Sequence, residues 1–327
     1  MPATQRDLPR IGEPAPLTRL FGWSMLAILA AFMINNVLTV WFEFPGASAA
    51  AEGGLGVIQA AVYIVAFGLA VAYVMRSPDG ALRWDAQKIS FFNRYLIRSC
   101  FWVVVMVGVV DATIAFMRTE QLFDGLMSDD MVKQMGIARF VGPYIHTPLI
   151  VLGFIIGLFT RTLGFTWLAL LIVVAELGIV ISRFVFSYEQ ALMGDLVRYW
   201  YAALFLFASA YTLLDEGHVR VDVFYAGFSS RKKGVVNAIG SILLGMTTAW
   251  IIIFIGFNGK TAIINSPIVN FEVTQTGGVG MFIKYHMAAF LGIFAITMLI
   301  EFVAYMMEAV ADYRDEPGRR ETAAVSH

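Results

Sequence analysis

The chain has 327 residues, of which 59% are hydrophobic and 14% are charged, and its formal net charge is −1. A soluble domain carries about 25% charged residues, so this chain has too little polar surface to cover a globule in water. The balanced charge argues against nucleic-acid binding, the aromatic content of 14% argues against disorder, and the lone Cys100 excludes an intrachain disulfide. The composition predicts an all-α polytopic membrane protein.

Eight apolar segments are long enough, or nearly so, to cross the hydrocarbon core, which takes about 20 residues of helix. The eight segments are Trp23–Phe42, Leu55–Met75, Ser99–Met117, Tyr144–Thr160, Leu163–Phe186, Val197–Leu214, Val235–Phe257 and Met287–Glu308. The fourth segment is short and meets the fifth at Arg161 and Thr162, where a tight hairpin between two helices is one reading. The boundary between these two segments is therefore left open.

The Lys and Arg residues are distributed unevenly among the connections between these segments. If the N-terminus is cytoplasmic, sixteen of the 23 lie in inside segments and seven lie outside. Because cytoplasmic loops are enriched in Lys and Arg, this asymmetry predicts that both termini are cytoplasmic and that the number of spans is even. Cleavage at the small residues 47–51 would leave seven spans. The apolar run before them exceeds the roughly 7–15 residues of a signal peptide, so we expect it to remain as an anchor.

The two longest outside loops predict ordered structure rather than a soluble domain. Apolar residues between Phe123 and Ile137 recur at a spacing that favours a short helix lying at the membrane interface. The second loop, 258–286, is rich in Asn, Thr and Gly and is typical of a structured loop. The tail after Asp312 is polar, and we expect it to be loose.

Several motifs of membrane enzymes and pumps are missing from the sequence. Residues 256–261 have glycine, lysine and threonine at the wrong spacing for a phosphate-binding loop, which argues against ATP-driven transport. Neither HExxH nor GxSxG occurs, which argues against a membrane hydrolase. We predict no catalytic residue, no cofactor and no metal site.

Ionisable residues inside the predicted spans are candidates for an ion or proton path, because they are costly there. Asp111, Glu176 and Glu301 lie in three different spans, without discontinuous helices to frame a site, so we favour hydrogen bonds to neighbouring helices. His146 and His286 both fall at the outer ends of spans, where they are candidate axial ligands of a haem. The simpler reading, which we favour, is interfacial histidines with water or loop partners.

The densest group of charges beside a span follows the sixth apolar segment. Glu216, His218, Arg220 and Asp222 alternate with small or valine residues in the run Glu-Gly-His-Val-Arg-Val-Asp-Val. Alternation with period two predicts an extended or tightly turned stretch whose apolar side is buried.

The run 216–223 resembles the signature loop of the small membrane subunit, of the DctQ type, of tripartite ATP-independent periplasmic (TRAP) transporters. Arg183, followed by aromatic residues, is similar to the end of the first helix of that family. The segment Ser-Tyr-Glu-Gln ending at residue 190 is similar to the family segment that follows, although Glu189 stands alone where an acidic pair is usual. The resemblance covers about Leu163–Asp312.

The resemblance implies a four-helix small-permease domain over 163–312, preceded by an N-terminal extension (1–162) of about four further spans and followed by a tail (313–327). It also implies two partners, a large permease subunit and a periplasmic substrate-binding protein, in the bacterial inner membrane. The large subunit carries the substrate and sodium sites and moves as an elevator. The small subunit braces the static scaffold during the uptake of small organic anions such as carboxylates.

The resemblance also gives roles to particular residues. Glu216, His218, Arg220 and Asp222 either fix the cytoplasmic end of the scaffold or only cap two helices within a self-contained turn. Arg183 and Glu189, near the outer face, would pair and hold the second helix of the unit.

Two other functions remain open from the sequence. One is a self-sufficient secondary transporter that uses Asp111, Glu176 or Glu301. The other is a haem-bearing or quinone-associated membrane subunit that uses His146 and His286.

Overall fold

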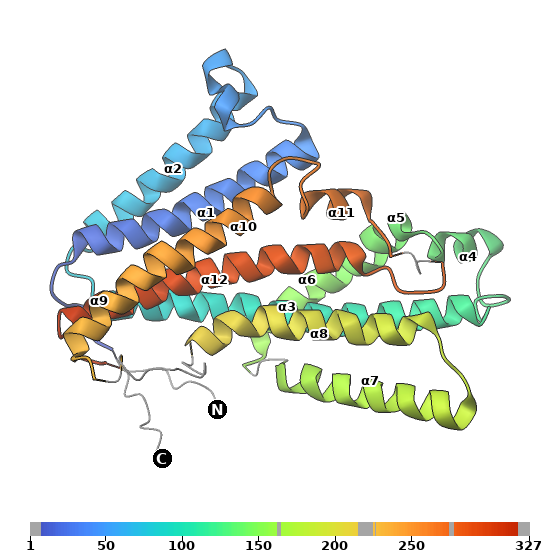
Figure 1. Cartoon of the computed structure of the whole chain (residues 1–327). Coiled ribbons are helices and arrows are strands. Elements are labelled where there is room, and N and C mark those ends of the chain that lie inside the picture. Colours follow the sequence, from blue (N-terminus) through green and yellow to red (C-terminus); the bar gives the residue numbers. More distant parts are fainter. Residues whose placement is uncertain (1–7, 162–164, 215–224, 226, 275–277, 320–327) are drawn as a thin grey trace.

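The computed structural model describes residues 8–161, 165–214, 225, 227–274 and 278–319, and these are almost entirely helical (Figure 1). The helices are α1 (Pro16–Phe42), the 3₁₀ turn η1 (Ala47–Glu52), α2 (Leu55–Arg76), α3 (Leu82–Thr119), α4 (Asp129–Met135), α5 (Ala138–Val141), the π-helical η2 (Gly142–His146), α6 (Thr147–Phe159), α7 (Phe165–Phe186), α8 (Ala191–Leu214), α9 (Ser230–Gly240), the π-helical η3 (Ser241–Met246), α10 (Thr247–Gly256), α11 (Asn265–Asn270) and α12 (Lys284–Tyr313). Within the described residues there is no β-strand, which confirms the predicted all-α fold.

Eight of these helical rods are long and apolar enough to cross a membrane, as the sequence predicts. Two rods are composite: α5, η2 and α6 form Ala138–Phe159, and α9, η3 and α10 form Ser230–Gly256. The helix that contains the expected third span, Ser99–Met117, is longer than that span, because α3 begins at Leu82. The first turns of α3 are rich in charged residues, which made them resemble a loop in the sequence.

Two helices, α3 and α12, form the centre of the bundle. Half of the most apolar window of each is buried within the protein, a larger share than in the other span-length helices of the described chain. They run antiparallel, and α12 also packs on α1, α8 and the α9–η3–α10 rod. We refer to α1–α6 as the N-terminal half and to α7–α12 as the C-terminal half, so that α3 and α12 join the two halves.

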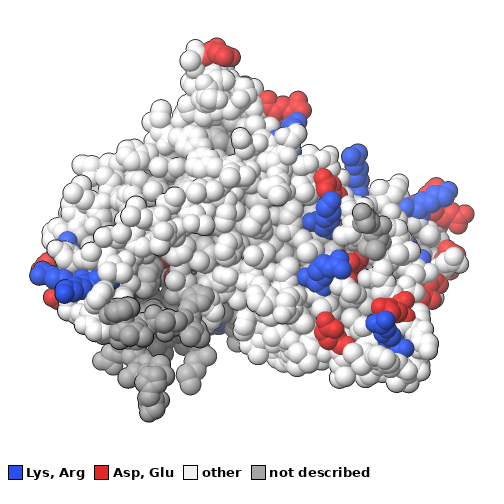
Figure 2. Space-filling model, viewed as in Figure 1, with Lys and Arg blue, Asp and Glu red and all other residues white. Residues whose placement is uncertain are grey.

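The two ends of the bundle differ in the elements that they gather. The start of α1, the start of α3 and the end of α12 meet at one end, here called the terminal end, where Arg314 lies 3.2 Å from Glu13. The segment α4–α5 and the segment before α12 lie at the opposite end, here called the loop end (Figure 1). On the face shown in Figure 2, most charged side chains lie towards these two ends, and the surface between them is largely uncharged.

The packing of α6 on α3 depends on glycine. A Cβ atom at Gly153 would lie 2.8 Å from the backbone nitrogen of Val103, and one at Gly157 would lie 3.1 Å from the Cα of Ser99. Only glycine therefore allows the two helix backbones to approach so closely, as small residues do in membrane bundles.

Two elements lie at the periphery. The α1–α2 hairpin is held within itself by Gln59, whose backbone carbonyl accepts a hydrogen bond from Asn35 Nδ2 at 3.0 Å. Asn36 on α1 exchanges hydrogen bonds with Asn265 of α11, at 3.2 and 2.9 Å, which links the hairpin to the C-terminal half. Helix α7 packs mainly on α8 and leaves most of its circumference exposed (Figure 1).

Candidate functional site

The described residues bring the predicted intramembrane carboxylate Asp111 together with both predicted histidines. Asp111, on α3, is 1% exposed, and its Oδ2 accepts a hydrogen bond of 2.7 Å from the backbone N–H of Phe282. Its Oδ1 lies 3.3 Å from Nε2 of His146 in η2. Nδ1 of His146 contacts the hydroxyl of Tyr285 and lies 3.2 Å from Nε2 of His286. Asp111, His146, Tyr285 and His286 thus form one buried group, here called the loop-end cluster.

The loop-end cluster is incompatible with the alternative in which His146 and His286 are the axial ligands of a haem. A haem needs its two axial histidines on opposite faces of the macrocycle. Here the nitrogen atoms of His146 and His286 are in direct hydrogen-bond contact, which leaves no space for a haem between them.

A second carboxylate supports the same segment before α12. Oδ2 of Asp195, on α8, accepts a hydrogen bond of 3.1 Å from the backbone N–H of Met281, the residue next to Phe282. The two carboxylates, Asp111 and Asp195, therefore lie beside the N-terminus of α12, where the helix dipole favours negative charge. The segment is also held by Arg118 of α3, whose guanidinium carbon lies 4.4 Å from the centre of the Phe282 ring.

The third predicted carboxylate, Glu301, is bound by α3 in the middle of the bundle. The hydroxyl of Ser90 donates to Oε1 at 2.8 Å, and Nδ2 of Asn93 donates to Oε2 at 3.0 Å. Asn93 also donates to the carbonyl of Thr297 at 2.9 Å. Glu301 is 2% exposed, so its contacts are those of a group that joins two helices.

At the terminal end, α3 is joined to α12 by Arg83, a residue that the sequence analysis did not predict. Arg83, near the start of α3, is 2% exposed. Its Nη1 lies 2.8 Å from Oε2 of Glu308 and its Nη2 lies 2.7 Å from Oδ1 of Asp312, both on α12. It also donates to the carbonyl of Glu316 at 3.0 Å.

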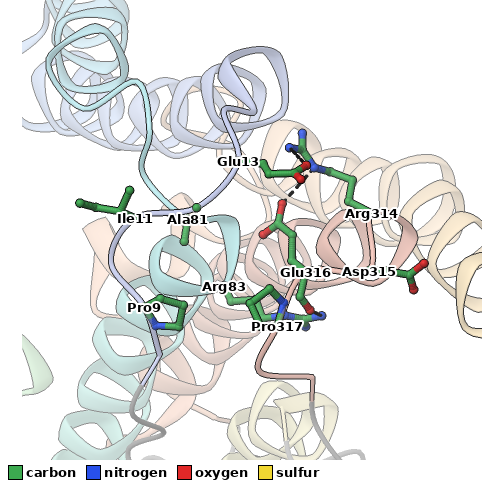
Figure 3. Close-up of a pocket in the computed structure, with 10 residues that line it drawn as sticks. Pro9, Ile11, Glu13, Ala81, Arg83, Arg314, Asp315, Glu316 and Pro317 are labelled. Atoms are coloured by element: carbon green, nitrogen blue, oxygen red, sulfur yellow. Dashed lines mark hydrogen bonds and ion pairs between the residues drawn. The ribbon is translucent and has the colours of Figure 1, made fainter.

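A cavity of about 90 Å³ lies beside Arg83. Figure 3 shows Glu13, Arg314 and Glu316 converging at its rim, where Arg314 lies 3.2 Å from Glu13 and 3.0 Å from Glu316. Burial raises the pKa of the Glu316 carboxyl, and the neighbouring arginines oppose that shift. The cavity is lined by Pro9, Ile11, Gly12, Glu13, Ala81, Arg83, Arg314, Asp315, Glu316 and Pro317. The N-terminal segment and the end of α12 thus meet around paired charges.

A further buried ion pair fixes α1 to α3 at the same end. Nε of Arg19 lies 2.7 Å from Oδ2 of Asp85, and both side chains are 1% exposed. Asp85 also accepts a hydrogen bond of 3.0 Å from Nε1 of Trp23. Arg83, Asp85, Asp195 and Glu308 were all absent from the predicted site residues. A spacing of seven residues along α3, which Arg83 shares with the predicted Asp111, is the sequence signal that could have found Arg83.

The remaining predicted residues are placed as follows. Nε of Arg183 lies 3.4 Å from Oε2 of Glu189, and both side chains are more than half exposed. Glu176 is exposed at the middle of α7, away from the other predicted carboxylates. The predicted loop residues Glu216, His218, Arg220 and Asp222 lie outside the described residues.

The buried polar groups described above join helices to one another. Among the described residues, no group of three or more His, Cys, Asp or Glu side chains is placed to hold a metal ion. The buried polar groups instead connect α3 to α12 at both ends and in the middle. The arrangement is that of a bundle whose two halves are locked together.

Comparison with models of known protein families gives a match. Residues 169–309 match the family described as tripartite ATP-independent periplasmic transporters, DctQ component. Neither the search of curated proteins nor the search of solved structures gave a match. The match lies within α7–α12, inside the range that the signature-loop resemblance covers, and the span-like helices before it are additional. Residues 169–309 are therefore similar to the DctQ component, the small permease component of TRAP transporters.

Proposed function

We propose that the chain is an accessory, non-catalytic small permease subunit that braces the scaffold of a larger, sodium-coupled elevator subunit. The observation that carries this proposal is the set of buried polar contacts that join α3 to α12 and to the segment before α12. Arg83, Glu301 and Asp111 are each engaged in fixed contacts across this interface or with the segment before α12. A scaffold that resists a moving partner needs such fixed contacts, whereas an ion path needs groups that exchange partners.

The proposal includes the partners, the cargo and the location that the family resemblance implies. The large subunit holds the substrate and sodium sites, and a periplasmic binding protein delivers a small organic anion, most simply a carboxylate. The chain resides in the bacterial inner membrane with both termini in the cytoplasm. The uneven distribution of Lys and Arg supports this orientation, and so does the meeting of the first and last span-length helices at one end of the bundle. In this proposal residues 1–162 enlarge the scaffold around the domain at 163–312.

Co-purification with the large subunit tests the proposal. The affinity-tagged chain is co-expressed with the proteins of its neighbouring genes, among which the proposal requires a large permease, and the complex is purified in mild detergent. We expect the two subunits to elute together. If the tagged chain is recovered well folded without the large permease, the proposal is wrong.

Co-purification also tests the role of the loop at 216–222. We propose that Glu216, His218, Arg220 and Asp222 help to fix the cytoplasmic end of the scaffold to the large subunit. Arg220→Ala should then lower the yield of complex, whereas Arg231→Ala, on the exposed start of α9, should not. An unchanged yield for Arg220→Ala would instead favour a turn that only caps its own helices.

Substitution of Glu301 distinguishes an accessory scaffold subunit from a self-sufficient transporter. Because Glu301 is hydrogen-bonded to Ser90 and Asn93, glutamine can keep most of its contacts without a charge. We expect Glu301→Gln to retain more than half of the uptake of the reconstituted complete transporter. Uptake of the substrate by this chain alone in liposomes, abolished by Glu301→Gln, would support the transporter instead.

A further inference from the structure

Glu176 is unusual among the carboxylates of the span-length helices because its side chain is exposed. It lies at the middle of α7 (Phe165–Phe186), about eleven residues, or roughly 16 Å, from either end of the helix. Asp111 and Glu301 are buried and bonded to neighbouring helices, whereas α7 turns Glu176 away from the bundle. At this depth a carboxylate facing lipid has neither water nor a hydrogen-bond donor, and such residues face protein or a water-filled cavity almost without exception.

The exposed part of α7 has two different faces. The exposed Val173, Glu176, Val180 and Arg183 and the half-buried Ala169 recur at alternating spacings of four and three residues, the pattern of a helix–helix seam. We call this row the Glu176 seam. It runs beside the buried strip of Leu168 and Ile172, through which α7 packs on the bundle.

The other exposed face of α7 carries larger apolar residues, namely Leu170, Leu177, Ile181 and Phe184. This bulky face suits contact with acyl chains. Around Glu176 the seam has the smaller Ala169, Val173 and Val180, which allow a second helix to come close. The chemistry of the two faces therefore differs, and only the seam contains a group that lipid cannot satisfy.

We propose that the Glu176 seam is the surface on which a transmembrane helix of the large permease subunit packs. That helix presents a hydrogen-bond donor, a cation or an amide, to Glu176 near the middle of the membrane. This inference rests on the proposed function, because it needs the large subunit to be present. A second copy of the chain is a poorer occupant, since two α7 helices related by a two-fold axis along the membrane normal would place one Glu176 carboxylate against the other.

Site-specific photo-crosslinking tests which face is covered. A benzophenone amino acid is introduced singly at Val173 or Val180 on the seam, and at Leu170 or Leu177 on the bulky face as matched controls. Each variant is co-expressed with the large permease, irradiated in membranes, and its adducts are identified by mass spectrometry. We expect adducts with the large permease from Val173 and Val180, at a yield at least fivefold above those from Leu170 and Leu177.

The outcomes separate this inference from the proposed function. If the large permease co-purifies with the unmodified chain but the adducts form mainly from the bulky face, or with a second copy of the chain, the seam assignment is wrong. The same holds if the complex forms and neither seam position gives an adduct. If no complex forms even with the unmodified chain, the proposed function itself has failed.

The carboxylate can be tested in the same complex. Glu176→Gln keeps an acceptor and should leave the complex yield within twofold of the unmodified chain. Glu176→Leu should lower that yield about tenfold, because the buried donor on the partner then has no acceptor. The control is Leu177→Ala on the bulky face, which should have little effect, and an unchanged yield for Glu176→Leu would overturn the inference.

Discussion

Replacing Arg83 with alanine should cause the largest loss of stability among the single changes considered. The guanidinium is buried and lies within 2.8 Å of carboxylate oxygens of both Glu308 and Asp312. Its removal takes the nearest cation away from both carboxylates, and breaking a buried ion pair in this way costs roughly 3–5 kcal/mol. The expected result is a lower apparent melting temperature of the detergent-solubilised chain, measured by size-exclusion chromatography after heating.

Two further variants test whether the loss of stability in Arg83→Ala comes from its ion pairs. Arg76→Ala removes an exposed arginine at the end of α2 and should leave the melting temperature within about a degree. The double change Arg83→Met with Glu308→Met replaces most of the buried pair by apolar side chains and should recover much of the loss. A melting temperature of Arg83→Ala equal to that of Arg76→Ala would show that the ion pairs do not lock the terminal end.

Replacing Asp111 with leucine should loosen the opposite end of the same interface. The change leaves the backbone N–H of Phe282 without its acceptor in a buried site, and it removes the carboxylate that lies 3.3 Å from Nε2 of His146. Each buried group that loses its partner costs about 1–3 kcal/mol. We therefore expect a lower melting temperature and more frequent separation of α3 from its neighbours.

The lone cysteine of the chain reports on that separation. Cys100 lies on α3 between Asn93 and Asp111 and is 8% exposed. Its modification by N-ethylmaleimide, followed by intact mass, should be severalfold faster in Asp111→Leu than in the unmodified chain. Asp111→Asn keeps an acceptor for Phe282 and should give an intermediate rate, whereas equal rates for all three proteins would contradict this account.

The number of spans was predictable from the sequence because the apolar segments are long and separated by charged or polar stretches. The start of α3 was not predictable, since the four Lys, Arg or Asp residues from Arg83 to Arg94 lower the local hydropathy. Several of these charges are compensated by partners: Arg83 reaches Glu308, more than 200 positions away along the chain. A hydropathy scale assigns each residue type a fixed free energy of transfer, so it cannot account for a distant partner that neutralises the charge.

A spacing of seven residues in the sequence of α3 does indicate which of its polar residues are buried. Arg83, Ser90, Ile97, Val104 and Asp111 are separated by seven residues each, and all five are buried. On a helix this spacing places residues along one stripe, so the polar members of the stripe must face protein.

The same spacing occurs on the partner helix. Glu301 and Glu308 of α12 also lie seven residues apart, and they meet Ser90 and Arg83 in an antiparallel register. The repeat predicts a buried seam on each helix, but which helix pairs with which follows only from the three-dimensional structure. The meeting of Asp111 with His146 and His286 likewise could not be derived, because η2 and α12 are separated by 140 residues at that point.

The length of α3 has a mechanical consequence. Its 38 residues make a rod of about 57 Å, against a hydrocarbon thickness of about 30 Å, so the rod tilts steeply or projects into water at its ends. It is tethered near its first tip by Arg83, about a quarter of the way along by the Ser90–Asn93 pair, and about three quarters of the way along by Asp111. A rod held at three points along its length resists bending and sliding alike. A load applied at the loop end would therefore reach the terminal end with little lost to deformation, as through a strut that crosses the bilayer.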